Sequence, residues 1–182
     1  MEALALSTGR DVQYGAALAS AVAGSTARAQ ALADDLAKRF PEDTVVQFNY
    51  LPTIHAQLAL RRNDASKAIE ILQNTTPYDL GIPATNFSYV SLFPIYVRGQ
   101  AYLAGRRASG AAAEFQKILD HRSVVNEPIG ALAHLQIGRA YGMQGDVTEA
   151  RAAYHAFLAL WKDADPDIPI LKQAKAEYAG LQ

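Results

Sequence analysis

Apolar and small residues recur along this chain at helical spacing, and no stretch shows the sustained apolar–polar alternation of a β-strand. The last segment shows the pattern most simply, with apolar residues at positions i, i+1, i+4 and i+8: Ile170, Leu171, Ala174 and Tyr178. Such a helix has one face for a core and one for water. With Gly and Pro as boundaries, the pattern predicts helices at 11–23, 26–39, 43–61, 65–74, 87–104, 108–121, 128–143, 147–162 and 167–181.

The eight prolines agree with most of these boundaries. Six of them lie between the predicted helices or in their first turns, where a missing backbone N–H leaves no hydrogen bond unmade. Pro52 and Pro94 are the exceptions, because each falls inside a predicted helix. Two alternatives stay open for both positions. Either the helix begins at the proline, or it carries an extra, kinked turn.

A pattern of small and aromatic residues repeats after 39 residues in the second half of the chain. Each copy has Gly first, Tyr at +3, Ala at +12 and an aromatic at +16: Gly99, Tyr102, Ala111 and Phe115, then Gly138, Tyr141, Ala150 and Tyr154. Two weaker copies are centred on Ala29 and Ala68. The breaker-rich loop 76–83 accounts for the longer interval between Ala68 and Ala111. Because a small residue lets two helices cross closely, each copy predicts a packed helix pair.

These offsets resemble the tetratricopeptide repeat. We therefore predict an all-α fold, an α-α superhelix (a solenoid like that of tetratricopeptide repeats) of about four helix pairs plus a C-terminal capping helix. The chain, 1–182, is expected to be a single repeat domain, with repeats at about 11–41, 42–77, 87–122 and 126–163 and the capping helix at 167–181. Because the first residues are typical of the middle of a helix, we expect the domain to be excised from a longer chain.

The amino-acid composition excludes several classes of protein and of site. Half of the residues are hydrophobic and 19% are charged, which is typical of a folded domain rather than a disordered one. The net charge of −1 gives no electrostatic basis for binding nucleic acid. No apolar run approaches the roughly 18 residues that a membrane-spanning helix needs, so we expect no direct membrane insertion. The absence of cysteine excludes disulfides, thiolate metal sites and a cysteine nucleophile.

Three segments, 38–44, 126–130 and 158–172, resemble the C-terminal part of bacterial eukaryotic-like serine/threonine protein kinases. In these proteins a kinase domain is followed by tetratricopeptide repeats, and the resemblance covers only that repeat half. It implies a kinase accessory region. It leaves open whether the region lies on the cytoplasmic or the extracytoplasmic side of a membrane-anchored parent protein. No glycine-rich loop, His-Arg-Asp or Asp-Phe-Gly motif is present, so no kinase activity is expected in this chain.

No other group of residues has the spacing of a catalytic or metal site, so we expect no enzyme activity, no metal and no cofactor. The four histidines include no pair at i, i+3 or i, i+4, the spacing of a metal pair on one helix. Segment 163–167 opens like a calcium loop. However, Ile168 stands at the glycine position and Ala174 at the glutamate position. Its aspartates are typical of helix N-caps.

The concave face, formed by the first helix of each pair, is the candidate site. Positions counted from the small residue carry the aromatic, amide, Met and Arg side chains that suit a peptide groove: Tyr14, Tyr50, Thr53, Gln57, Arg61, Phe93, Tyr96, Gln100, Leu135, Arg139 and Met143. For each of them, packing between neighbouring helices is an open alternative. The Lys and Asn pair that clamps a terminal carboxylate in chaperone-binding members of the fold is missing, so we expect no such clamp.

These observations give two hypotheses of different classes. The first is a scaffold module that binds a peptide or partner protein in its groove and serves a linked kinase. The alternative is a structural spacer or self-association element with no peptide ligand, for which a homo-oligomer would be the assembled form. The sequence does not identify the partner.

Overall fold

The structure, a computed structural model, describes residues 3–80, 92–121 and 128–181. These residues contain ten α-helices and no strand. The helices are α1 (Ala3–Leu6), α2 (Arg10–Val22), α3 (Thr26–Arg39), α4 (Leu51–Arg61), α5 (Ala65–Gln73), α6 (Phe93–Ala104), α7 (Ala108–Asp120), α8 (Ile129–Gln144), α9 (Val147–Leu160) and α10 (Pro169–Ala179). A π-helical turn, η1 (Val46–Tyr50), precedes α4, and a 3-10 turn, η2 (Thr76–Tyr78), follows α5.

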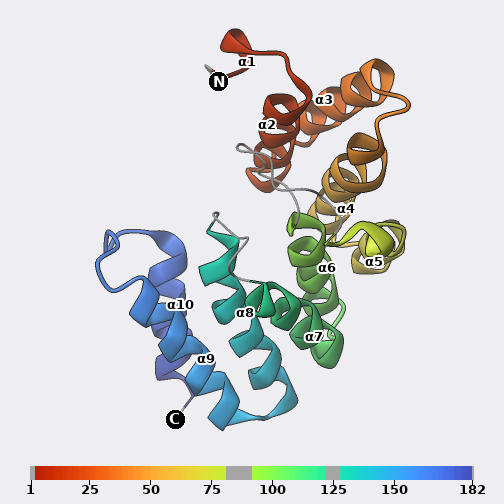
Figure 1. Cartoon of the computed structure of the whole chain (residues 1–182). Coiled ribbons are helices and arrows are strands. Elements are labelled where there is room, and N and C mark those ends of the chain that lie inside the picture. Colours follow the sequence, from red (N-terminus) through yellow and green to blue (C-terminus); the bar gives the residue numbers. More distant parts are fainter. Residues whose placement is uncertain (1–2, 81–91, 122–127, 182) are drawn as a thin grey trace.

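The helices form two layers that follow the order of the chain (Figure 1). The inner layer consists of α2, α4, α6 and α8, each of which contacts the next. The outer helices α3, α5 and α7 each pack on the inner helix before them and on the one after. The last outer helix, α9, packs on α8 and on α10, and the two chain ends lie at opposite ends of the array. The predicted all-α superhelix is confirmed.

A residue with positive φ makes the turn inside each helix pair, and these residues follow the repeat spacing: Gly24 (85°), Asn63 (60°), Arg106 (56°) and Gly145 (80°). A left-handed residue just after a helix is the common way to end it, and glycine adopts it at least cost. The sequence suggests Gly105 for this role in the third pair. The structure gives it to Arg106, which is a strained position for a residue with a Cβ.

Glycine at the helix crossing is required by close packing. A Cβ added to Gly99 in α6 would lie 2.6 Å from the ring of Phe115 in α7. At Gly138 in α8, an added Cβ would lie 2.9 Å from the ring of Tyr154 in α9. Both distances are below any normal carbon–carbon contact, so the small residue and the aromatic residue of each copy occupy complementary positions in one crossing.

The two prolines inside predicted helices, Pro52 and Pro94, lie in different local structures. Pro52 lies in a continuous helical segment, two positions after the end of η1 at Tyr50. The N–H of Leu51 there donates to the carbonyl of Val46, five residues back. The wider π turn makes room for a ring that would clash with the carbonyl four residues before it. Pro94, by contrast, lies in the first turn of α6. The helix predicted at 87–104 therefore begins at Phe93 in the described part, and 87–91 lie outside the residues that the structure describes.

Candidate partner-binding groove

A groove of about 650 Å³ runs along the inner layer. Its lining residues come from α2, α4, α6 and the start of α8: Tyr14, Gly15, Leu18, Ala19, Val22, Ala23, Gln57, Phe93, Tyr96, Val97, Gln100, Pro128, Ile129 and Leu132. A volume of this size lies within the range of about 300–1,000 Å³ that is usual for ligand sites. The helices that form the groove are far apart in the sequence and come together because the inner helices stack.

The groove lining is almost entirely apolar. No Lys, Arg, Asp or Glu is among the described residues that line it, and Gln57 and Gln100 are its only side-chain amides. Val22 is 58% exposed, which is high for an aliphatic side chain beside other apolar residues. Phe93 is half-buried, and the ring of Tyr96 lies almost fully within the protein with its edge toward Phe115. Contiguous apolar surface of this kind is typical of interaction sites.

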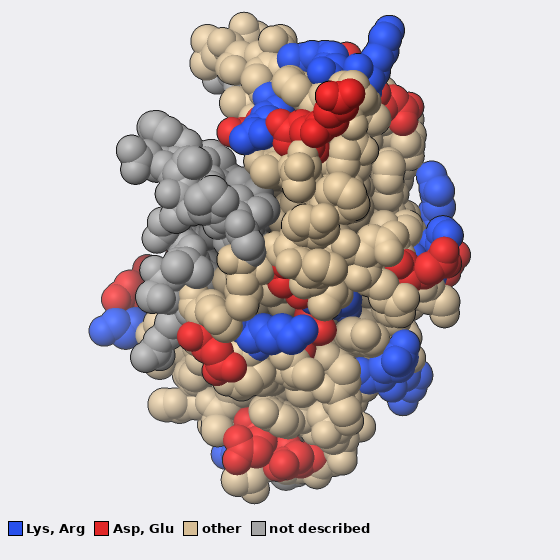
Figure 2. Space-filling view, turned by 45° about the vertical axis from the view of Figure 1, so that its right-hand side comes forward, with Lys and Arg blue, Asp and Glu red and all other residues tan. Residues whose placement is uncertain are grey.

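On one face of the molecule, the charges of the described residues are mixed in sign. On the face that Figure 2 shows, positive and negative side chains lie beside one another among the described residues. Ion pairs among the described residues include Lys67 with Glu70 at 2.8 Å and Lys172 with Asp167 at 2.7 Å. Long-range attraction of a polyanion or polycation would need a field of one sign, so the apolar groove is the more specific feature of this surface.

Five of the predicted groove residues line the groove in the structure: Tyr14, Gln57, Phe93, Tyr96 and Gln100. Tyr50, Thr53 and Leu135 do not, because they are buried at 1%, 0% and 0% exposure. The ring of Tyr50 stacks on Tyr14 with 4.0 Å between centroids, and its hydroxyl donates to Asp11. The Thr53 hydroxyl donates to the carbonyl of Asn49 in the preceding turn, which makes its burial inexpensive.

The predicted Arg and Met positions also lie away from the groove. Arg61 is exposed at the end of α4, where its guanidinium lies against Gly24 in the turn after α2. Met143 is 42% exposed near the end of α8 and does not line the groove. Both residues lie in the last turn of their helices.

Arg139 of α8 instead forms an ion pair with the C-terminal helix α10. Its Nε and one terminal nitrogen each lie 2.9 Å from the Glu177 carboxylate of α10. The Tyr154 hydroxyl of α9 donates to the same carboxylate at 2.7 Å. Burial raises the pKa of Glu177, but these hydrogen bonds outweigh it and hold the pKa below its usual value. Three helices therefore meet at one charged contact.

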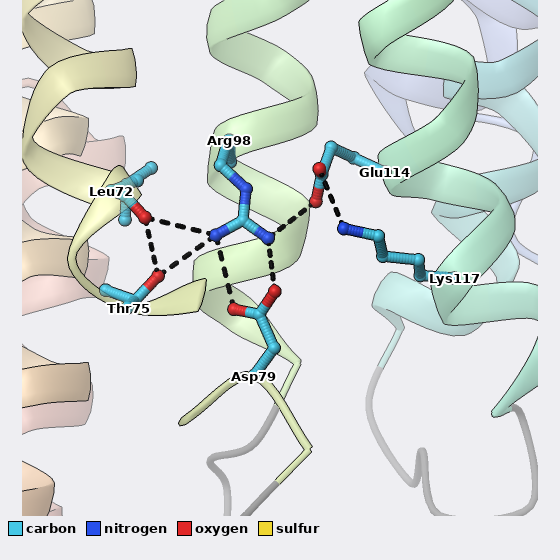
Figure 3. A network of polar contacts seen from close by, with 6 residues as sticks. All are labelled: Leu72, Thr75, Asp79, Arg98, Glu114 and Lys117. Atoms are coloured by element: carbon cyan, nitrogen blue, oxygen red, sulfur yellow. Dashed lines mark hydrogen bonds and ion pairs between the residues drawn. The ribbon is translucent and has the colours of Figure 1, made fainter. Parts of the chain in front are cut away.

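A buried ionic network, which the sequence analysis did not anticipate, joins α5, α6 and α7 (Figure 3). Arg98 of α6 is 2% exposed and donates to Asp79, to Glu114 at 2.7 Å and to the carbonyl of Leu72 at 3.1 Å. It also donates to the Thr75 hydroxyl at 3.0 Å. Burial lowers the Arg98 pKa, but hydrogen bonds to the two carboxylates outweigh it and the net pKa is raised. One signal was present in the sequence, an Arg within the apolar run 93–103.

Two further findings concern metal ligands and membrane spans in the described part of the chain. In that part of the chain, no three His, Cys, Asp or Glu side chains come close enough to hold a metal ion. Nor does any described helix combine the length and hydrophobicity of a membrane span. Burial is the largest influence on the pKa of the His55 ring, and it lowers that pKa.

One comparison with known proteins bears on this arrangement. Residues 132–164 match the family described as tetratricopeptide repeat, and they span most of α8, all of α9 and the turn after it. No curated protein matches the sequence significantly. The match covers the pair that contains the Gly138–Tyr154 crossing. Together with the all-α superhelical fold, it supports a tetratricopeptide repeat region in this chain.

Proposed function

We propose that this chain is a protein-interaction module that holds a segment of a partner protein in the groove along α2, α4, α6 and α8. Tetratricopeptide repeats in general mediate protein–protein interaction, and stacked repeats present concave binding surfaces. The observation that carries the proposal is the continuous apolar lining, with Val22 58% exposed on it. We place the repeats at 11–41, 42–77, 87–122 and 126–163, with α10 as the cap.

The test is a matched pair of charge insertions. Val22→Glu places a carboxylate on the groove, whereas Val147→Glu places one at the start of α9, where Val147 is 45% exposed and outside the groove. Both valines are exposed enough for the fold to tolerate the change. Binding to a peptide array should be lost in Val22→Glu and kept in Val147→Glu. Equal binding by the two variants would remove the groove assignment.

We also propose that the module is the accessory region of a bacterial serine/threonine kinase. The support is the resemblance of segments 38–44, 126–130 and 158–172 to the repeat half of such kinases. The proposal requires a kinase domain ahead of this segment in the same open reading frame. A frame that encodes this segment with no kinase domain would refute the kinase link and leave the interaction module untouched.

A structural spacer or self-association element is the second candidate, and one observation favours it. A second hollow of about 480 Å³ lies on α2, α1 and the start of α3, lined by Leu4, Val12 and Ala16 among others. It shares Gly15, Ala19 and Ala23 with the groove. This small-residue face of α2 has the form of a surface that another helix could cover. Light scattering over a dilution series tests it. A dimer that Ala16→Arg dissociates would support self-association, and a monomer throughout would refute it.

A further inference from the structure

The groove contains two polar side chains at equivalent positions of neighbouring helix pairs. Gln57 of α4 directly follows the small residue Ala56, and Gln100 of α6 directly follows the small residue Gly99. Both glutamines line the groove. The inner helices α4 and α6 are in contact, and the axes of helices packed in this way lie roughly 8–10 Å apart. Apolar residues surround them on α2 and α8.

Neither carboxamide has a hydrogen-bond partner among the described residues. This is notable for Gln57, because the residue is only 9% exposed. A carboxamide offers two donors and an acceptor with two lone pairs. Water can satisfy them in the free protein. A segment that displaces this water must supply hydrogen bonds of its own, or its affinity falls.

We infer that the groove takes an extended, uncharged, apolar polypeptide segment whose main-chain amides pair with the carboxamides of Gln57 and Gln100. This inference rests on the proposed groove function and names the chemistry of the partner. A peptide backbone offers both a donor and an acceptor at each residue without bringing a charge into the apolar groove. A charged segment would lose water there and find no countercharge on the described lining.

The extended form follows from the same hydrogen-bonding argument. A helical segment already satisfies its backbone groups internally and would leave both carboxamides unpaired. An extended chain has free amides and rises about 3.3 Å per residue, so two to three residues span the roughly 8–10 Å between neighbouring inner helices. Its side chains would then pack against Val22, Phe93 and Ile129.

The experiment uses the whole chain and an array of acetylated, amidated heptapeptides. One set alternates apolar residues with Ser, and a second set carries Asp or Lys in place of Ser. We expect binders in the neutral set alone. For the best binder, fluorescence anisotropy should show a loss of roughly 3–10-fold in affinity for Gln57→Leu and again for Gln100→Leu, which is the worth of one hydrogen bond. N-methylation of the contacting peptide amides should weaken binding comparably.

Gln73→Leu is the matched control, because Gln73 is exposed at the end of α5 and does not line the groove. The outcomes separate the inference from the function on which it rests. Charged peptides that bind in a manner sensitive to Val22→Glu would keep the groove and overturn its neutral chemistry. Neutral binders indifferent to N-methylation and to both Gln→Leu changes would overturn the main-chain contact. No binder in either set would overturn both.

Discussion

Replacement of Arg98 by Met should be among the most damaging single substitutions in this protein. The Arg98 side chain is 3% exposed, and its two carboxylate partners, Asp79 and Glu114, are each 9% exposed. Arg98→Met would leave both carboxylates in the interior. Glu114 would keep Lys117 at 3.0 Å, whereas Asp79 has no other partner among the described residues. Removal of one member of a buried ion pair typically costs about 3–5 kcal/mol of unfolding free energy.

This loss of unfolding free energy is large relative to the total stability of a domain. A domain has about 5–15 kcal/mol of stability, and in a chain of this length each 1 kcal/mol shifts the melting temperature by about 2–4 °C. Arg98→Met should therefore lower it by roughly 6–20 °C. Urea unfolding followed by circular dichroism measures the free energy. Because repeat arrays are stabilised through neighbouring interfaces, amide exchange should accelerate first in α5 and α6.

Two variants make this reasoning refutable. Lys67→Met breaks a pair whose side chains are 51% and 67% exposed, so it should change stability by no more than ~0.5 kcal/mol. The triple variant Arg98→Met, Asp79→Leu, Glu114→Leu removes every buried charge of the network and leaves only the half-exposed Lys117. It should recover most of the loss, since apolar replacements of buried ion networks are often neutral or better. A loss under about 1 kcal/mol for Arg98→Met would contradict the argument from burial.

Three further predictions follow from single positions. The folded pKa of Glu177 is depressed below 4.5, so its contact with Arg139 adds stability above that pH. This stability is lost as the pH falls through the folded pKa. Acid unfolding of Glu177→Gln should lack this loss of stability, and a profile like that of the wild type would contradict the prediction. Arg106→Gly should raise the unfolding free energy by about 1 kcal/mol, because the φ of 56° is strained for Arg; calorimetry that shows a loss would refute this. Gly99→Ala should lower the unfolding free energy by about 1–3 kcal/mol, because the added Cβ would clash with a ring of α7. An added Cβ at Gly15 meets nothing within 4 Å, so Gly15→Ala should be neutral or stabilising. Urea unfolding compares the two variants.

The helices and their pairing could be read from the sequence because they depend on neighbours along the chain. The same close helix crossing occurs twice in the chain. In each case a glycine, Gly99 or Gly138, packs against the aromatic residue 16 positions later. Helix ends were predicted within a few residues for the same reason, since capping and breaking are local. For Pro52 the sequence left two alternatives open, a helix that begins there or an extra kinked turn, because a missing N–H permits either outcome. The π turn before it was found only in the structure.

The candidate site could be predicted only in part. Helical spacing identifies which side chains share a face of α4, but not how deeply the next pair covers that face. Gln57 therefore lines the groove, while Thr53, one turn earlier, is fully buried. Arg139 has the sequence position of a groove residue, yet Glu177 lies 38 positions later and binds it.

The sequence by itself determined the all-α repeat architecture, because periodicity and small-residue spacing are properties of neighbouring positions. Only the tertiary structure decided which polar side chains are partnered. Arg98, Asp79 and Glu114 come from one helix, a loop and another helix, and no spacing rule links them. Hydrogen bonds and ion pairs form between groups that meet in space. Their partners, and with them the chemistry of the groove, depend on how the helix pairs stack.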